Sequence, residues 1–440
     1  MTSAGAPSRP ATGFRRVRGL LPRGSDTVGA WLLVAGLAAY GFLTVAGRAL
    51  GSERASALSA LWALGFLLAP GTFMPVEQEL ARALAERRAL GLGGRPVARR
   101  AAVGAAVLAA VLVAGLACSA PFTLHRLFDG QVLLLVGLGL LLVGYAIEHV
   151  AKGVLAGADR FGPYGRLNGA EALVRLGAGA LLAVGGVRSA GPFGLALGLA
   201  PFAGVAVALV GQRDLLRPGP PAARGELTRS IGWLLLASLL AQVLLNAGPV
   251  VVQALAGPGQ RDAAGQFLAS LVIARVPVFL FQAIQATFVP ELAGLAATGR
   301  HDRFRQGMRR LVALVGGLLG LATVGGWVAG PAVVGALFGA EFALGSRDLA
   351  MLAAASSCYL LALTLAQVLI ALARPARVAL GWSIGTVGFA IGVLTTSDLL
   401  LRVQIGLLCG TVGATAAMGL LLAGPLARQA PIRSVGTAAG

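Results

Sequence analysis

Two arginines lie near the middle of long apolar stretches, where a charged side chain is costly. Arg175 follows Glu171 by four residues, so both share one helical face and can form an ion pair. Arg275 has no acid nearby on its own stretch, but Gln282 lies seven residues further on the same face, and Pro277 weakens the local backbone ladder. A guanidinium in such a place suits phosphate, because its fork donates two parallel hydrogen bonds.

Each charged group has a structural and a functional interpretation. Glu171 and Arg175 either neutralise each other or line a cavity and exchange partners with a ligand or a proton. Arg275 either pairs with an acid on another helix, such as Glu171, or faces a cavity and binds an anion. Glu148 and His149 end another apolar stretch and are interpreted as interfacial, although ion coupling through Glu148 or Glu171 stays open.

A polar stripe, Ser238, Gln242 and Asn246, recurs at four-residue spacing in a further apolar stretch. A polar stripe that faced lipid would be costly, so we expect it to face the bundle. It either forms interhelical hydrogen bonds or supplies a hydrogen-bonding wall for hydroxyl groups of a ligand.

The composition is that of a polytopic membrane protein. Apolar residues make up 57% of the chain and charged residues 12%, with a mean hydropathy of +0.82, whereas soluble domains carry about 25% charge. The net charge of +19 is spread between apolar runs rather than clustered, so nucleic acid is not an expected partner. No phosphate-binding loop, metal cluster or nucleophile–base set appears, so we expect neither an enzyme nor a cofactor.

The elements that carry these side chains are predicted to be twelve transmembrane helices, because a span needs about 20 residues and the backbone cannot cross lipid unpaired. The last part of the ninth stretch, 330–342, is expected to bend. The stretches are 27–47, 56–78, 101–121, 131–151, 167–187, 191–211, 230–256, 264–290, 309–338, 349–372, 376–397 and 400–426.

Positive charge predicts the orientation. Of the 36 lysine and arginine residues, seven fall in the expected outer segments, two lie inside spans and the rest fall in the inner segments. This bias places both termini in the cytoplasm of a protein of the inner or plasma membrane.

The chain carries traces of an internal repeat. "GTFMP" at 71–75 matches "ATFVP" at 286–290, and Arg160 matches Arg374 at almost the same offset. Both Thr-Phe-x-Pro copies are expected to mark the inner ends of helices. Two six-helix lobes related by a parallel pseudo-two-fold repeat are the arrangement of alternating-access transporters. The predicted divisions are a tail at 1–26, lobes at 27–211 and 230–427, a linker at 212–229 and a tail at 428–440.

Three stretches resemble the MOP flippase superfamily, in its polysaccharide-export, O-antigen flippase-like branch. They are "PVEQELARALAERRALG", "GADRFGPYGRLNGAEALVRLGAGALL" and "AAGQFLASLVIARVPVFLFQAIQATFVPELAGL". The resemblance implies a flippase that moves a polyprenyl-(pyro)phosphate-linked oligosaccharide to the outer leaflet. It also implies membrane lipids, and a polysaccharide polymerase and glycosyltransferases, as partners. The substrate-binding candidates are then Arg275, Arg175, Glu171, Gln282, Asn246 and Gln242.

The alternative within the superfamily is a cation-coupled multidrug antiporter, which would use membrane-embedded carboxylates. The first and seventh predicted helices hold no internal acid. A membrane glycosyltransferase or polymerase would need a sizeable outer loop with acids, whereas the outer acids here are scattered. The saccharide, the coupling ion and the oligomeric state do not follow from the sequence.

Overall fold

The computed structural model describes residues 25–212, 214–222, 226–227, 231–276, 301–372 and 374–428, and within these ranges the chain is helical and holds no strand. Its elements are α2 (Ser25–Ala89), α3 (Arg95–Cys118), α4 (Ala120–Phe122), the π-helix η1 (Thr123–Leu127), α5 (Val132–Gly157), α6 (Phe161–Val184), α7 (Ala190–Leu209), α8 (Ile231–Leu255), α9 (Ala263–Ala274), α11 (His301–Phe338), the 3₁₀ turn η2 (Ala340–Phe342), α12 (Ser346–Ala371), α13 (Pro375–Val393) and α14 (Leu399–Arg428).

Eleven of the twelve predicted spans correspond to helix in this structure, and the all-α fold class is confirmed. The first two spans are joined within α2 and meet at Gly51, whose φ of 75° and ψ of 166° turn the chain without a loop. The eighth span is described through α9 only, and its remainder lies outside the described residues. Ten of the described helices, with α2 counted once, are long and apolar enough to cross a membrane, so the chain is a multi-pass membrane protein.

One local prediction about a helix end is wrong. α2 does not end at "GTFMP" but continues past Pro75 to Ala89, because a proline removes one backbone donor without forcing a helix to stop. The second copy, 286–290, lies outside the described residues. The bend expected within 330–342 is present: α11 continues through Pro331, and the chain turns at Gly339 with φ of 123°.

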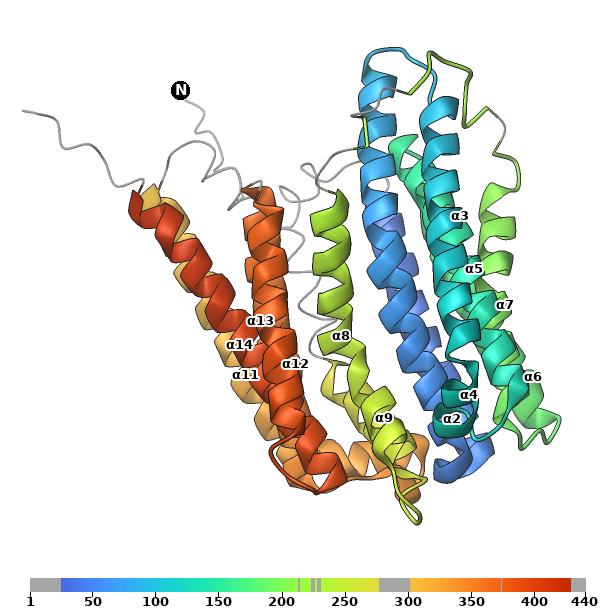
Figure 1. The fold of residues 1–440 in the computed structure, drawn as a ribbon, viewed down its shortest axis with the longest axis vertical. Coiled ribbons are helices and arrows are strands. Elements are labelled where there is room, and N and C mark those ends of the chain that lie inside the picture. The colour runs from blue at the N-terminus through green and yellow to red at the C-terminus, as the bar shows by residue number, and fades with distance from the viewer. Residues whose placement is uncertain are drawn as a thin grey trace, which may run out of the picture.

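The helices form two groups, α2–α7 (the first lobe) and α8–α14 (the second lobe) (Figure 1). We call the end that carries Ala89 and Arg428 the terminal end, and the opposite end the Gly51 end. The two groups lie close together at the Gly51 end, and their ribbons diverge toward the terminal end (Figure 1).

Arg160 and Arg374, the second pair of the sequence repeat, occupy equivalent positions in the two lobes. Each precedes a helix, α6 or α13, as its N-cap, with φ and ψ of −94° and 60° for Arg160 and −119° and 55° for Arg374. Each donates its backbone N–H to the carbonyl five residues earlier, at 2.8 Å for Arg160 and 3.0 Å for Arg374.

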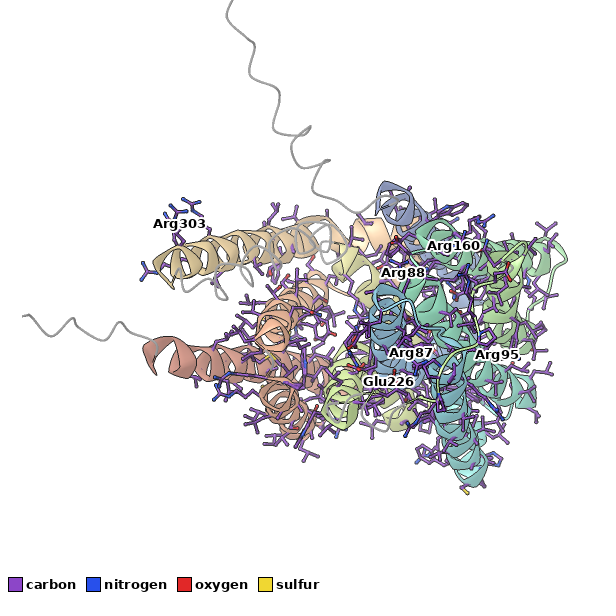
Figure 2. The ribbon with its side chains drawn as sticks, turned by 90° about the horizontal axis from the view of Figure 1, so that it is seen from above. Arg87, Arg88, Arg95, Arg160, Glu226 and Arg303 are labelled. Atoms are coloured by element: carbon purple, nitrogen blue, oxygen red, sulfur yellow. The ribbon has the colours of Figure 1, made fainter. Side chains whose placement is uncertain are left out.

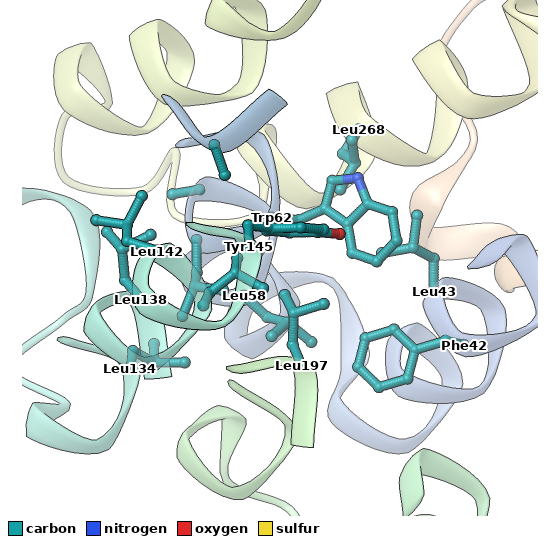
Figure 3. Close-up of a cluster of buried hydrophobic side chains, with 14 of the residues drawn as sticks. Phe42, Leu43, Leu58, Trp62, Leu134, Leu138, Leu142, Tyr145, Leu197 and Leu268 are labelled. Carbon is teal, nitrogen blue, oxygen red and sulfur yellow. The ribbon is translucent and has the colours of Figure 1, made fainter. Parts of the chain in front are cut away.

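Each lobe has its own hydrophobic core. In the first, Phe42 stacks on Trp62 with ring centroids 6.1 Å apart, beside Leu58 and Tyr145 (Figure 3). The second is built around Trp382 and its neighbours. Leu268 of α9 belongs to the first core rather than the second, which shows that the lobes pack against each other near the Gly51 end (Figure 3).

Candidate functional site

Polar contacts between the lobes begin at a proline in α2. Pro70 has no N–H, so the carbonyl of Phe66, four residues earlier, lacks its helical partner. Asn246 of α8 donates its Nδ2 to this carbonyl at 3.2 Å and to Gln242 Oε1 at 2.8 Å. Gly71 permits this approach, because a Cβ there would lie 3.2 Å from the Leu239 Cα. Two members of the polar stripe, Asn246 and Gln242, therefore face the bundle as predicted, and Asn246 contacts the opposite lobe.

Arg275 joins this group from the end of α9. Its Nη1 donates to Asn246 Oδ1 at 3.4 Å, so Arg275, Asn246 and Gln242 lie together. Gln282 lies outside the described residues. Arg275 also lines a small pocket within the second lobe, whose other walls are Leu244, Leu245, Leu271, Ala355, Ser356, Tyr359, Leu407 and Thr411.

The surroundings of Arg275 are neutral in the part of the chain that the structure describes. The groups that act on its charge are the phenols of Tyr40, from the first lobe, and Tyr359, from the second. None of the ion pairs between described residues includes Arg275, and its Nε is inaccessible with no described partner. The charge therefore has no carboxylate among these neighbours to neutralise it.

Glu171 and Arg175 lie inside the first lobe and not with Arg275. Arg175 Nη1 donates to Glu171 Oε1 at 2.9 Å, and the Tyr145 hydroxyl donates to the same oxygen at 3.0 Å. The Arg175 guanidinium lies 5.3 Å from the centre of the Trp62 ring and 5.9 Å from that of Phe66. The predicted alternative in which Glu171 pairs with Arg275 is not observed.

A second buried polar cluster lies between this pair and the terminal end. Glu148 and His149 are 0% and 5% exposed, so their interpretation as interfacial residues is wrong. Both lie on the face of α5 that the neighbouring helices of the lobe cover. Lys152 Nζ lies 2.5 Å from Glu148 Oε1, and His149 Nδ1 lies 2.6 Å from Glu77 Oε2.

Sequence reasoning missed Glu77, which also accepts a hydrogen bond from the Tyr164 hydroxyl at 2.9 Å. The sequence did contain a signal for the neighbouring pair of Glu148 and Lys152. Lys152, the only lysine in the sequence, follows Glu148 at the four-residue spacing that also joins Glu171 to Arg175. The Tyr145 and His149 rings, with centroids 5.8 Å apart, connect the two clusters into one buried network. No group of three or more potential metal ligands occurs among the described residues.

At the Gly51 end, direct contacts hold the lobes together. Arg48 donates to the carbonyls of Ala336 and of Leu337, the latter at 2.6 Å, in the last turn of α11. The Gly265 N–H of α9 donates to Ser56 Oγ at 2.9 Å. A cation over the free carbonyls of a helix C-terminus is favourable, because it complements the helix dipole.

Exposed charges surround these contacts. Arg261, in the turn between α8 and α9, lies 3.9 Å from Glu53, which follows the Gly51 kink. Burial raises the pKa of the nearby Asp129 above its usual value, an effect that Arg261 opposes and Glu53 reinforces. This group adds charge across the same junction of the lobes.

Comparison with known proteins gives the fold. No family model matches the chain. It is 25% identical over 425 residues to an uncharacterized protein of Mycobacterium bovis, covering 93% of this chain and 94% of the relative. It is 27% identical over 425 residues to an uncharacterized protein of Mycobacterium tuberculosis, covering 94% and 93%.

The similar solved structures are transporters. An inward-facing multidrug resistance MATE family transporter of the MOP superfamily superposes with a TM-score of 0.70 at 12% identity, over 94% of this chain and 98% of the other. An outward-facing multidrug resistance MATE family transporter of the same superfamily gives 0.60 at 14% identity, over 92% and 93%. A MATE structure in the bent conformation gives 0.62 at 13% identity, over 96% and 99%. The chain therefore has the fold of these MATE transporter structures.

Proposed function

We propose that this protein is an alternating-access transporter that flips a polyprenyl-(pyro)phosphate-linked oligosaccharide from the inner to the outer leaflet. The observation that carries the proposal is Arg275, a cation where the lobes meet whose described neighbours are all neutral. A guanidinium held by Asn246 and flanked by two tyrosines keeps its full charge for an incoming anion.

An anionic substrate is favoured over a cationic one because two buried cations in the described part of the first lobe are already neutralised by carboxylates. Arg175 is paired with Glu171 and Lys152 with Glu148 inside the first lobe. At the lobe interface an uncompensated arginine would repel a cationic drug and attract a phosphate. Gln242 and Asn246 beside it would bind sugar hydroxyls once the substrate replaces their present hydrogen bonds, while the polyprenyl tail stays in lipid.

The arrangement of the lobes supports alternating access. Contacts of Arg48, Ser56 and Gly265 join the lobes at the Gly51 end, and the ribbons diverge at the terminal end (Figure 1). An inward-facing MATE structure superposes on this chain with a TM-score of 0.70, and an outward-facing one with a TM-score of 0.60. With the terminal end in the cytoplasm, as the charge bias predicts, the substrate would enter from the inner leaflet.

A cation-coupled multidrug antiporter is the second candidate, because the compared structures include multidrug resistance transporters. The observation that favours it is the buried network of the first lobe, with the carboxylates of Glu77, Glu148 and Glu171. The same network is compatible with a flippase that couples lipid movement to an ion. The substrate, and not the presence of carboxylates, therefore distinguishes the two functions.

Reconstitution tests the proposal. Proteoliposomes are loaded with a polyprenyl pyrophosphate-linked oligosaccharide that carries a fluorescent sugar, and movement is followed by quenching from outside. We expect Arg275→Gln to lose most of the flipping rate and Arg275→Lys to keep part of it. A lysine retains the positive charge but lacks the two parallel N–H donors of a guanidinium.

Arg402→Gln is the matched control. Arg402 also lies in the second lobe and also donates to a neutral group, the Val393 carbonyl at 2.9 Å, but at the Gly51 end. Equal flipping by Arg275→Gln and the wild type would refute the role of Arg275. Efflux of a cationic dye by the wild type, without lipid flipping, would favour the antiporter instead.

A further inference from the structure

The segment between the lobes is attached to the first lobe over much of its length. Arg87, near the end of α2, is 3% exposed. Its Nε and Nη2 donate to both carboxylate oxygens of Glu226, at 2.7 and 3.0 Å. The remaining donors reach the carbonyls of Gly93, Pro220 and Pro221 at 2.7, 3.0 and 3.2 Å. Figure 2 shows Arg87 and Glu226 close together at the terminal end.

Backbone contacts hold the preceding part of the segment against the turn between α2 and α3. The Arg95 N–H donates to the Arg217 carbonyl at 3.1 Å. Gly93 and Gly219 allow the two backbones to meet, because a Cβ on Gly93 would lie 1.9 Å from the Pro218 carbonyl oxygen and one on Gly219 would lie 2.3 Å from the Gly93 oxygen. Both positions therefore need glycine, which the sequence interpretation of 212–229 as a plain linker did not anticipate.

A further arginine anchors the same point. Arg82 Nη2 donates to the Glu226 backbone carbonyl at 2.6 Å, while its Nε donates to Glu79 and its Nη1 donates to Glu86. Glu226 is thus fixed to the end of α2 through its side chain and its backbone. Because bidentate arginine–carboxylate pairs are geometrically specific, this is a defined attachment point.

The attachment shortens the covalent connection between the lobes. α7 ends at Leu209 and α8 begins at Ile231, and a free segment of that length could reach about 75 Å when extended. From Glu226 to Ile231 the chain can reach only about 17 Å. The start of the second lobe is therefore tethered closely to the end of α2.

We infer that Arg87 and Glu226 form a strap that limits how far the lobes separate at the terminal end. The inference rests on the proposed alternating access, in which that end must open to admit a substrate. The strap limits the opening, because the chain from Glu226 to the start of α8 can reach only about 17 Å.

Distance measurements between spin labels at Arg166→Cys and Ala376→Cys, one in each lobe near the terminal end, test the strap. They are made in lipid nanodiscs, in a background with Cys118, Cys358 and Cys409 replaced by serine. We expect Glu226→Gln and Arg87→Gln to add a population at longer distances. Arg88→Gln, which changes the neighbouring exposed arginine, is expected to leave the distribution unchanged.

Two insertions keep the test valid if the substitutions impair folding. Four Gly-Ser residues after Leu227 lengthen the tether by about 14 Å and leave the ion pair intact, so they should also add longer distances. The same insertion after Gln212 lies between α7 and the attached segment, both on the first lobe, and should have no effect.

An unchanged distribution in Glu226→Gln and after the Leu227 insertion would overturn the inference, and so would equal effects of the two insertions. The measurement needs no substrate. Failure of lipid flipping with a normal strap response would therefore refute the proposed substrate and not the strap.

Discussion

The ion pair of Glu171 and Arg175 is a direct test of whether the first lobe uses its charges for structure or for transport. The side chains are 8% and 4% exposed and share Tyr145 as a neighbour. Replacing Arg175 by methionine keeps an apolar side chain against Trp62 and leaves the Glu171 carboxylate buried with one hydrogen bond. Breaking a buried pair in this way costs about 3–5 kcal/mol.

The double variant Glu171→Gln with Arg175→Met should recover most of that loss. Glutamine can keep the hydrogen bond from Tyr145, and no charge remains to be solvated. Replacing both members of a buried pair is often neutral or stabilising, so the two substitutions should be strongly non-additive, by about 3 kcal/mol. The free energy of unfolding is measured by titration with a denaturing detergent in mixed micelles.

Arg82 and Glu86 provide a matched control pair. They have the same four-residue spacing and a similar distance, 3.0 Å, but their side chains are 43% and 63% exposed. An exposed pair of this kind contributes about 0.3–0.5 kcal/mol. If Arg175→Met costs no more than Glu86→Gln, the reasoning from burial is refuted.

Flipping by the double variant then separates the two interpretations of the pair. A stable double variant that still flips lipid assigns the pair to structure. A stable double variant that no longer flips lipid assigns it to transport, either as part of the path or as a coupling site. Either result depends on the stability measurement, which has to show first that the protein is folded.

Three further predictions concern how the helices meet. Arg48→Ala removes charge-assisted hydrogen bonds to the end of α11, worth about 1.5–3 kcal/mol, and should raise the labelling rate of a cysteine at Ser52 about tenfold or more; an unchanged rate would contradict a closing role. Pro70→Ala restores an N–H for the Phe66 carbonyl, so flipping should fall and Asn246→Ala should add little in that background; additive losses would show that the two sites act independently. Gly198→Ala brings a Cβ within 2.3 Å of the Gly137 carbonyl oxygen and should cost about 1–3 kcal/mol of unfolding free energy, whereas Gly139→Ala, with open space around it, should not destabilise; equal effects would show that α5 and α7 can move apart freely.

The length of the apolar stretches was enough to predict the helices. A single segment that crosses lipid can pair all of its own backbone N–H and C=O groups only as a helix. The kink at Gly51 was not predictable, since "GRALGSERAS" has the charge and glycine content of an ordinary loop. The continuation of α2 past Pro75 was missed for a related reason. A proline in the sequence shows that one backbone N–H donor is absent, but it does not show whether the helix continues or which group pairs with the freed carbonyl.

Among the candidate residues, contacts within one helix were predictable and contacts between helices were not. Four-residue spacing correctly placed Gln242 beside Asn246 and Glu171 beside Arg175, because such contacts depend on one helix only. The pairing of His149 with Glu77, 72 positions apart, depends on how α5 packs on α2 and has no local signal. The strap of Arg87 and Glu226 lies across 139 positions and is hidden for the same reason.

Asn246 connects the proposed binding event to the contact between the lobes. Its Oδ1 accepts from Arg275, while its Nδ2 donates to the Phe66 carbonyl that Pro70 leaves free. A phosphate on Arg275 would compete with Asn246 for the guanidinium donors and so release one side of this amide. The Phe66 ring lies 5.9 Å from the guanidinium carbon of Arg175, so the carbonyl that Asn246 holds and the ring that covers the buried network belong to the same residue. In the proposed cycle, the substrate and the buried network of the first lobe would therefore both act on the turn of α2 that contains Phe66. This is the turn where Asn246 of the second lobe hydrogen-bonds to the first lobe.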